Sequence, residues 1–302
     1  MELSKLTTEQ RNQNSANLDL MSTTEILETI NTEDKKVAVA VESVLPQVAI
    51  GVDQIFKALE DGGRLFYIGA GTSGRLGVID ASECPPTFMT PPEMVQTVMA
   101  GGSDAFFNAA EGSEDNEAQG KADLMAKSFT EKDVAIGITA SGRTPYPIGA
   151  LKYASEIGAY TISLSCNENS LISRHADCKI EVIVGPEVLT GSTRMKAATS
   201  HKMILNMIST TVMVKLGKVH QNLMVDVHAS NYKLIERAKR TVMEVTNVSY
   251  EEASRVLLLT NFEVKPAVVM LEAGVTYRQA QDAIALNKGY VRKAILYSLK
   301  TH

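Results

Sequence analysis

Two short stretches rich in glycine and hydroxyl residues are the residues of this chain best suited to bind an anion. The first is Gly69–Gly74 (GAGTSG), and the second is Thr139–Pro145 (TASGRTP). Glycine lets the backbone approach an anion closely, and serine and threonine hydroxyls donate hydrogen bonds to phosphate oxygens. The candidate phosphate ligands in the two stretches are Gly71, Thr72, Ser73, Ser141, Arg143 and Thr144.

The first stretch also fits the GxGxxG pattern of dinucleotide-binding folds, which is a weak signal on its own. Two features favour a phosphate monoester instead. The next strand is followed by Met99–Gly102 (MAGG), where a ribose-binding acid is expected, and the variable positions carry hydroxyls. One such stretch is usually only a helix cap, but two at strand ends favour a phosphate cradle.

Alternating strands and helices place both stretches at strand ends. The predicted strands are Arg64–Gly69, Val95–Ala100, Asp133–Thr139, Ala159–Ser165 and Lys179–Val184. The predicted helices between them are Gly74–Ser82, Ala105–Met125, Pro147–Ile157 and Ser170–Ala176. This alternation predicts an α/β fold, a doubly wound parallel five-stranded sheet covered on both faces. Ligands of such sheets bind outside the carboxyl ends of the strands.

The regions on either side of this sheet are predicted to be helical. Residues 1–34 are polar and weakly periodic, which predicts an arm, and Lys35–Leu59 has helical spacing with Pro46 kinking or dividing it. Gly191–Lys196 opens a long helix that runs to about Leu216, with Ser192 or Thr193 as its N-cap.

An internal repeat marks the C-terminal part. Thr246–Ala253 is echoed by Ala273–Ala280, with Ser249 and Thr276 where N-caps are needed, and we infer two helix–turn–helix copies that form a packing or dimerisation module. The predicted division is an N-terminal arm and helix (1–49), a sheet domain (50–220) and an all-helical subdomain (233–302).

Composition excludes several classes of function. The formal net charge is -5 and aromatic residues make up 5% of the chain, which argues against nucleic-acid partners. No long apolar run predicts a membrane span, and the polar Met1–Asn17 lacks the apolar segment of a secretion signal. Three cysteines without a CxxC pair, and histidines without ligand spacing (His175, His201, His220 and His228 among them), predict a cytoplasmic protein without a metal.

The pairing of GTSG with ASGRT resembles the SIS (sugar isomerase) domain of phosphosugar-binding proteins over about residues 50–220. A longer match makes the chain similar to the N-acetylmuramic acid 6-phosphate etherase family along nearly its whole length. The matching segments are Tyr67–Gly77, Asp80–Thr87, Gly191–Lys196 and Asn222–Asp226. One small departure is Ala198, where that family more often has glycine.

The resemblance implies a lyase that splits the D-lactyl ether at C3 of N-acetylmuramic acid 6-phosphate, in cell-wall amino-sugar recycling. It implies no cofactor and a homodimer, and it leaves open whether the active site is shared across the interface. It assigns Glu83 as the acid and Glu114 as a second catalytic group, with the role of Glu114 as base or water activator left open. Removal of the acidified C2 proton, protonation of the leaving oxygen and addition of water at C3 would complete the reaction.

The residues themselves support these assignments unequally. Glu83 precedes Pro85 and Pro86, so we expect it at a helix C-terminus, where the helix dipole and Asp80 would raise its pKa. Glu114 lies in an acidic run that is usually a solvated surface. Four cations lie on or beside strand-end loops: Arg75, Arg143, Arg194 and Lys196. We expect Arg194 and Lys196 to hold the lactyl carboxylate, with a surface or dimer role as the other interpretation.

Two other classes of function use the same phosphate cradle. A phosphosugar isomerase or amino-sugar synthase needs a base at C2 but no acid at C3. A non-catalytic sugar-phosphate sensor needs neither, but no DNA-binding segment precedes the domain. The carboxylates of Asp80–Thr87 favour the lyase.

Overall fold

The computed structural model describes residues 6–108, 110–226 and 231–301 of the chain. It forms two compact units, of which unit 1 comprises Met1–Ser82 with Glu93–Ser209, and unit 2 comprises Glu83–Pro92 with Thr210–His302. The boundary between the units falls within two helices, α3 (Gly71–Phe88) and α6 (Lys196–Lys215). The division predicted from the sequence, at residues 49, 220 and 233, stays a prediction.

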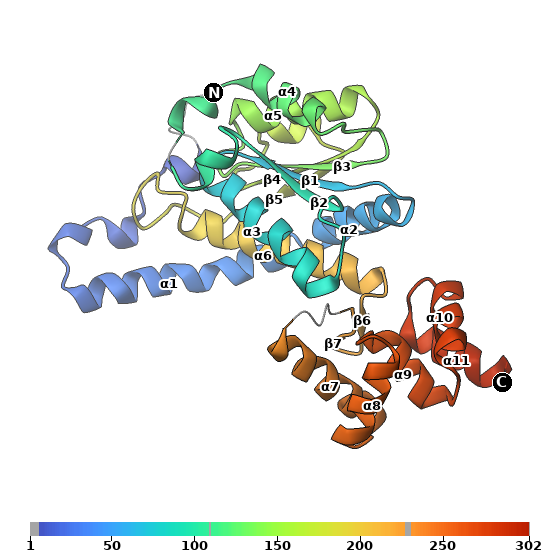
Figure 1. The fold of residues 1–302 in the computed structure, drawn as a ribbon. Helices are drawn as coiled ribbons and strands as arrows, with labels where there is room; N and C mark the ends of the chain where they lie inside the picture. Colours follow the sequence, from blue (N-terminus) through green and yellow to red (C-terminus); the bar gives the residue numbers. More distant parts are fainter. Residues whose placement is uncertain (1–5, 109, 227–230, 302) are drawn as a thin grey trace. The chain divides into compact units, whose positions relative to one another are not determined.

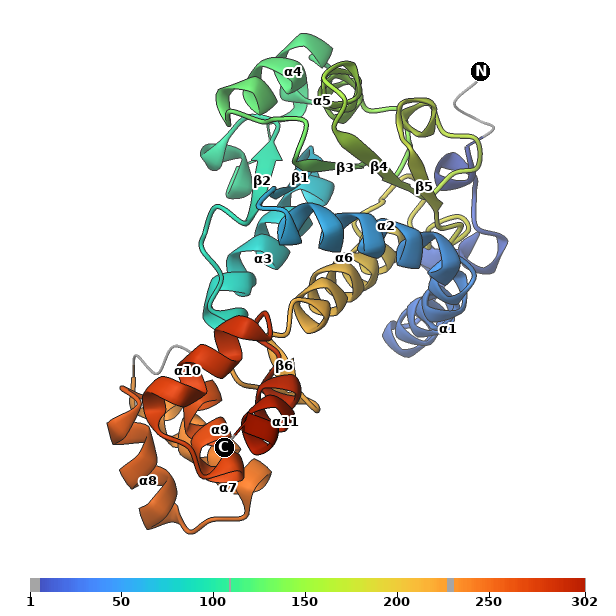
Figure 2. The ribbon, with the colours of Figure 1, turned by 90° about the vertical axis from the view of Figure 1, so that its right-hand side faces the viewer.

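Unit 1 is built on a parallel sheet with the strand order β2-β1-β3-β4-β5. The strands are β1 (Leu65–Gly69), β2 (Val95–Met99), β3 (Val134–Ile138), β4 (Tyr160–Ser165) and β5 (Cys178–Glu181). Helices α4 (Glu117–Ala126) and α5 (Pro145–Glu156) cover one face, and α2 (Leu45–Glu60), α3 and α6 cover the other (Figures 1 and 2). The predicted doubly wound five-stranded sheet is therefore confirmed. Every residue of β1 and β3 is buried, as their apolar runs require.

At β1, the direction in which successive strands are added across the sheet reverses. Gly69, the last residue of β1, pairs with Met99 of β2 on one side and with Ile138 of β3 on the other. The chain passes from β1 to one neighbour and then crosses to the other, so the segments after β1 and β3 diverge. Sheets of this kind hold ligands in the crevice at such a switch point.

The N-terminal helices differ from the sequence prediction. Helix α1 spans Thr23–Glu42, so the second part of the predicted arm is helical. Its start is a capping box, in which the Ser22 hydroxyl accepts from the N–H of Glu25 while the Glu25 carboxylate accepts from the N–H of Ser22. Pro46 lies in the first turn of α2 and divides the two helices, as the sequence allowed.

Three predicted helices have other limits. The segment predicted as Ala105–Met125 forms two 3₁₀ turns, Ser103–Phe106 and Glu111–Ser113, before α4 begins at the N-cap Asn116. The segment predicted as Ser170–Ala176 is the 3₁₀ turn Ile172–His175. Helix α6 begins at Lys196, later than predicted. Glycines and the cap at Asn116 interrupt the apolar spacing that suggested one long helix.

Unit 2 contains the predicted repeat. Ser249 caps α8 (Tyr250–Leu259) and Thr276 caps α10 (Tyr277–Leu286), each accepting from the N–H three residues on. They are followed by α9 (Val264–Ala273) and α11 (Val291–Thr301), while α7 (Tyr232–Thr246) and the short antiparallel pair β6 (Val219–His220) and β7 (Leu223–Met224) precede them. Two helix pairs, α8 with α9 and α10 with α11, thus follow one another, and their buried faces contribute to one apolar core. Their role as a packing or dimerisation module stays a prediction.

No single helix among the described residues has the length and apolar content to span a membrane. The pair α1 and α2, bent by 58°, meets that criterion only when the two helices are joined.

A buried ion pair joins α1 to the start of α6. Lys196 Nζ lies 2.7 Å from Glu33 Oε2, and the two side chains are 1% and 2% exposed. Burial alone would raise the pKa of Glu33, but hydrogen bonds from Lys196, Lys36 and Asn14 outweigh it and lower the pKa to about 2. The carboxylate therefore stays charged and fixes the arm to unit 1.

Lys196→Met should lower the free energy of unfolding by about 3–5 kcal/mol, because it leaves the Glu33 charge buried without its main partner. Lys36 donates to the same carboxylate but is 52% exposed, so Lys36→Met should cost only about 0–1 kcal/mol. Urea unfolding at pH 7 measures both values, and equal losses would contradict the role of burial.

The pH dependence follows from the lowered pKa of Glu33. Its contribution to stability is complete above pH 4.5, the ordinary value, and is lost as the pH falls toward 2. The same unfolding series with Glu33→Gln should therefore show a smaller loss of stability over that range.

Candidate active site

The first turn joins β1 to α3, and the backbone of the helix lies in close contact with the end of the strand. Gly71 has a φ of +52°, and a Cβ on Gly74 would lie 2.8 Å from the carbonyl oxygen of Gly69. A Cβ on Gly77 would lie 2.9 Å from Cβ of Tyr67, so the helix packs directly on the strand. The N–H groups that begin α3, from Gly71 onward, precede the first bond of the helix, in which Gly74 donates to Ala70. Free N–H groups at a helix N-terminus are suited to bind an anion.

The second turn joins β3 to α5 and carries its own hydroxyl cluster. Thr139 Oγ1 lies 2.8 Å from Thr144 Oγ1 and 3.3 Å from Ser141 Oγ, and the N–H of Arg143 donates to Ser141 Oγ. Gly142 has a φ of +72°, a conformation that favours glycine. The hydroxyls of Ser141 and Thr144 are partly exposed, so the turn presents donors at the sheet edge.

The structure brings these two turns together. Because β1 and β3 are neighbours with Gly69 opposite Ile138, both turns leave the sheet at the same carboxyl edge, on either side of the switch point.

Glu114 is exposed and is tied to the second turn through its backbone. Its carbonyl accepts from the N–H of Tyr146 (3.0 Å), in the first turn of α5, whose N-cap position is Thr144. The acidic side chain therefore lies on the loop between β2 and α4, on the same edge of the sheet.

Arg75 holds this loop in place. Its guanidinium donates to the carbonyl oxygens of Ala105 (2.9 Å), Phe106 (2.9 Å) and Asn108 (3.1 Å). The Arg75 guanidinium is thus bonded to backbone carbonyls of the same chain, and these bonds position the loop that carries Glu114.

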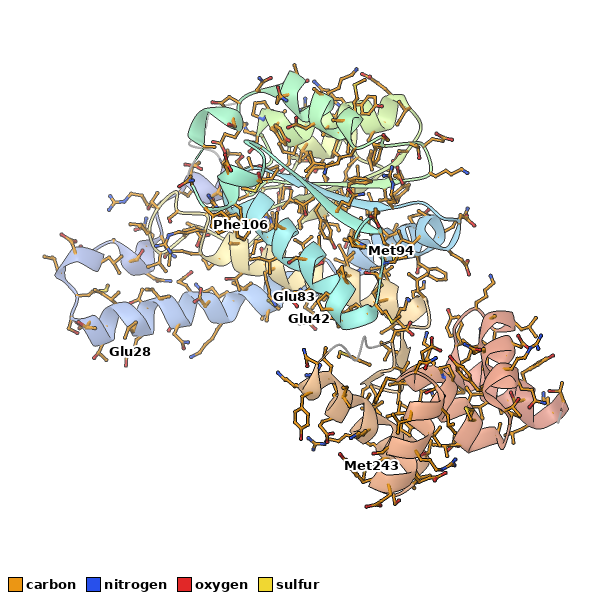
Figure 3. The ribbon with its side chains drawn as sticks, viewed as in Figure 1. Glu28, Glu42, Glu83, Met94, Phe106 and Met243 are labelled. Carbon is orange, nitrogen blue, oxygen red and sulfur yellow. The ribbon has the colours of Figure 1, made fainter. Side chains whose placement is uncertain are left out.

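Glu83 lies in α3, on an exposed part of the helix (Figure 3). The helix continues through Pro85 and Pro86 to Phe88, so the prediction that these prolines end it was wrong. Glu83 is five residues from the end of the helix, beyond the last turn in which the helix dipole acts. Asp80 points inward instead and accepts from Tyr67 (2.8 Å), Asn206 (2.6 Å) and Ser209 (3.1 Å).

The two cations expected to hold a carboxylate have different surroundings. Arg194 is exposed on the loop before α6, whereas the ammonium of Lys196 is buried against Glu33. The N–H groups of Lys196 and Ala197 donate to Glu187, so a carboxylate caps α6 in place of Ser192 or Thr193. Burial raises the pKa of Glu187, although these bonds oppose the shift.

Two residues that follow β4, Cys166 and Asn167, were missed by the sequence analysis. Cys166 Sγ lies 3.3 Å from His201 Nε2, and Asn167 contacts the second turn. Burial raises the pKa of the Cys166 thiol to about 12 and lowers the pKa of His201 to about 4, so both are neutral near pH 7. They are not an activated thiolate pair. Their position immediately after β4 is the signal that would have revealed Cys166 and Asn167. His228 lies outside the described residues.

Two cavities of unit 1 border the loops of this edge. One of about 220 Å³ is lined by Ser141 and Arg143 of the second turn, together with Leu6 and Ser170. Another of about 970 Å³ extends along β2 and includes Gly101 and Ser113, close to the Glu114 loop in sequence.

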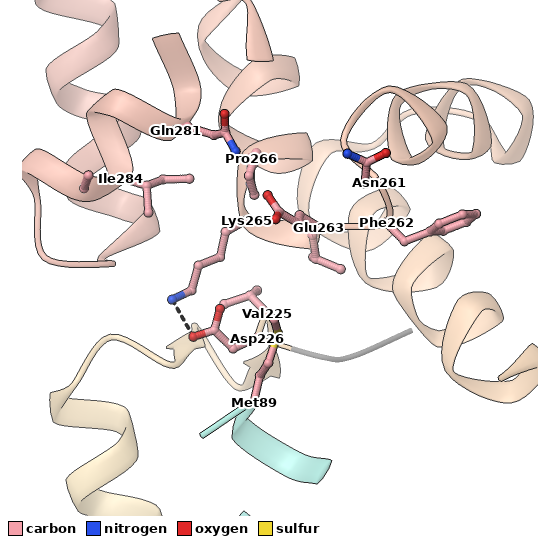
Figure 4. Close-up of a pocket in the computed structure, with 12 residues that line it drawn as sticks. Met89, Val225, Asp226, Asn261, Phe262, Glu263, Lys265, Pro266, Gln281 and Ile284 are labelled. Carbon is pink, nitrogen blue, oxygen red and sulfur yellow. Dashed lines mark hydrogen bonds and ion pairs between the residues drawn. The ribbon is translucent and has the colours of Figure 1, made fainter. Parts of the chain in front are cut away.

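Unit 2 has a separate cavity of about 470 Å³ (Figure 4). Lys265, on its wall, donates to Asp226 (2.7 Å), and Asp226 also pairs with Lys218 (3.0 Å). Burial lowers the pKa of Lys265 even though Asp226 opposes the shift. None of the candidate site residues lines this cavity.

Gly142→Ala should weaken binding of inorganic phosphate and sugar phosphates at least about tenfold. A Cβ at this position would lie 2.1 Å from Ser170 Oγ at a φ of +72°, so the turn must move. Gly158 has a φ of +84° with nothing within 4 Å, and Gly158→Ala should cost about 1–2 kcal/mol of stability without weakening binding. Calorimetric titration measures both variants, and unchanged binding by Gly142→Ala would exclude the turn as a phosphate site.

Two family models match parts of this chain, and solved structures share its fold. A family model described as the glucokinase regulatory protein N-terminal SIS domain matches residues 47–155, and the SIS domain model matches residues 108–210. A phosphoheptose isomerase from Francisella tularensis superposes with a TM-score of 0.53 at 16% identity, covering 64% of this chain and 100% of that chain. One from Neisseria gonorrhoeae gives 0.50 at 17% identity, with 63% and 98% covered. These likenesses establish the fold.

Similarity to curated relatives extends over nearly the whole length. The chain is 55% identical to the N-acetylmuramic acid 6-phosphate etherase of Bacillus pumilus, over 97% of each chain. It is 54% identical to that of Bacillus subtilis, over 98% of this chain and 97% of the relative, and 52% identical to that of Klebsiella aerogenes, over 98% of each. These similarities show that the chain belongs to the N-acetylmuramic acid 6-phosphate etherase family of SIS-domain proteins.

Proposed function

We propose that this protein is a carbon–oxygen lyase that cleaves the C3 lactyl ether of N-acetylmuramic acid 6-phosphate to N-acetylglucosamine 6-phosphate and D-lactate. The observation that carries the proposal is the meeting of two anion-binding turns at the switch point of the sheet, in a chain similar to named etherases from end to end. We assign the reaction to the cytoplasm, in keeping with three free cysteines.

The two turns hold the 6-phosphate. Backbone N–H groups at the start of α3 and of the second turn supply donors, and hydroxyls complete the shell. The proposed ligands are Gly71, Thr72, Ser73, Ser141, Arg143 and Thr144. Helix ends contribute only about 0.3–1 kcal/mol each, so several converging donors are needed to offset the dehydration of a dianion.

The lactyl carboxylate requires a cation of its own. Arg194 is exposed on a strand-end loop and can present its planar guanidinium to a carboxylate. Lys196 is buried with Glu33, so we assign it to the support of the arm and of α6 instead.

The ether is broken by elimination. Lactate is a poor leaving group, but in the open-chain sugar the C2 proton is acidified by the aldehyde. One group removes that proton while another protonates the departing oxygen, and water then adds to the unsaturated aldehyde at C3. We assign the protonation of the lactate oxygen to Glu83, and the second proton transfer to Glu114.

The length of α3 limits where Glu83 can act. From Gly71 to Glu83 the helix rises by about 18 Å, at 1.5 Å per residue. The phosphorus of the substrate is five bonds from C3, at most about 7 Å. A helix of this length favours a Glu83 supplied by another copy of the chain over one from the helix that holds the phosphate. We propose a homodimer in which Glu83 comes from the second copy.

Glu83→Gln and Glu114→Gln should each lower kcat by about 10²–10⁴-fold, because each removes one proton-transfer group. Asp115→Asn, a change of an exposed neighbour, serves as the matched control and should keep wild-type turnover. Release of D-lactate from N-acetylmuramic acid 6-phosphate measures the rates. In D₂O the product should carry deuterium at C2, and its absence would point to direct displacement.

Mixed dimers test whether the site is shared. When Glu83→Gln is co-expressed with Gly142→Ala, the heterodimer has one site with an intact turn from one copy and an intact Glu83 from the other. Random pairing should restore about a quarter of wild-type activity. If each chain used its own Glu83, co-expression would not raise the activity above the average of the two single variants.

A further inference from the structure

Asn167 lies immediately after β4 and links the N-terminal arm to the second phosphate turn. Its side chain is 2% exposed. The amide oxygen accepts from the N–H of Thr7 (2.7 Å), and the amide nitrogen donates to Ala140 O (3.1 Å) and Ser141 O (3.3 Å). The same nitrogen is 3.1 Å from Thr8 Oγ1. A single buried amide thus contacts both the arm and the second turn.

The contacts with Ala140 and Ser141 set the direction of the turn. In a trans peptide the carbonyl oxygen and the next N–H point to opposite sides. Holding Ala140 O toward Asn167 therefore turns the N–H of Ser141 away from it. Cys166 N also donates to Ala140 O (3.0 Å), so two donors hold this carbonyl. The orientation of a candidate phosphate donor thus depends on the amide of Asn167.

The loop that carries Asn167 is itself fixed. The Glu181 carboxylate accepts from the N–H groups of Asn169 (2.9 Å) and Ser170 (3.0 Å), and Ser170 Oγ donates to Asn167 O (2.7 Å). Ser170 lies next to Gly142, so the loop that carries Asn167 packs against the second turn.

The arm is anchored separately, so its contact with Asn167 can be changed alone. Asn12 donates to Pro186 O (3.1 Å), Ser15 donates to Val188 O (2.7 Å), and Asn14 donates to Glu33 (2.8 Å). The contacts of Thr7 and Thr8 with Asn167 connect the arm to the second turn and involve none of these residues.

We propose that Asn167 is a positioning residue, through which the docked arm holds the second turn in the conformation that binds phosphate. Asn167 does not touch the substrate. The inference rests on the proposed phosphate role of Ser141–Thr144.

Thr7→Pro tests the proposal because it deletes one N–H group and little else. Thr7 is the first residue of a 3₁₀ turn, where φ suits proline, and Leu6 before it is extended (ψ 132°), as a residue preceding proline must be. Thr7→Ala keeps the N–H and is the matched control.

Thr7→Pro should raise KM for N-acetylmuramic acid 6-phosphate about threefold to tenfold, the factor that one net hydrogen bond is worth. The value of kcat should stay within about twofold, because the phosphate is held equally in the ground and transition states. Thr7→Ala should match the wild type. An unchanged KM in Thr7→Pro, or an equal rise in Thr7→Ala, would overturn the proposal.

Asn167→Asp provides a second measurement. It keeps an oxygen that can accept from Thr7 but sets a carboxylate oxygen against the carbonyls of Ala140 and Ser141, so KM should rise more than in Thr7→Pro. A smaller rise would contradict the assigned orientation. If this variant does not fold, Thr7→Pro alone decides.

Ser141→Ala separates this inference from the function on which it rests. If Ser141→Ala raises KM while Thr7→Pro does not, the turn binds phosphate and only the positioning role is wrong. If neither variant changes KM, the phosphate assignment of the turn fails as well.

Discussion

The close approach of α3 to β1 is the constraint on which the candidate site depends. Gly69, Gly74 and Gly77 each lie where an added Cβ would come within 3.0 Å of other atoms of the strand, the turn or the helix. Only with hydrogen at these positions can the helix begin directly at the strand end. The free N–H groups of its first turn then open at the carboxyl edge, beside the turn that follows β3. The rest of the site is arranged around this edge.

In the proposed function, local geometry rather than overall charge supplies the anion site of this acidic protein. With a net charge of -5, the chain has no general attraction for a phosphorylated sugar. Two of the cations that could have served are engaged within the protein, because Arg75 holds the Glu114 loop and Lys196 neutralises Glu33. In the proposed site, oriented N–H groups and hydroxyls therefore supply most of the donors to the phosphate, and Arg143 and Arg194 are the cations assigned beside them.

The sequence predicted the sheet and its turns well because those features have local causes. Buried parallel strands are continuous apolar runs, and the glycines of both turns are required by their backbone conformations. The start of α1 was missed because an exposed helix has little apolar periodicity. Ser22 and Glu25 nevertheless have the residue types and the spacing of a capping box. The partners of Lys196 and Asn167 are distant in sequence and leave no local pattern. The sequence predicted Glu83 at the end of its helix because prolines usually end a helix. In the structure, α3 continues through Pro85 and Pro86, so Glu83 lies inside it.

The arm joins partners that are far away along the chain. Thr7 and Asn167 are 160 residues apart, and Glu33 and Lys196 are 163 apart. At about 5–20 residues per second, the ribosome needs about 10–30 s to make the chain between them. The arm is therefore synthesised first and can dock only after the strands that support the second turn exist. A nascent chain that ends before Lys196 lacks one of the partners that anchor the arm, so docking of the arm cannot be completed before that point of synthesis.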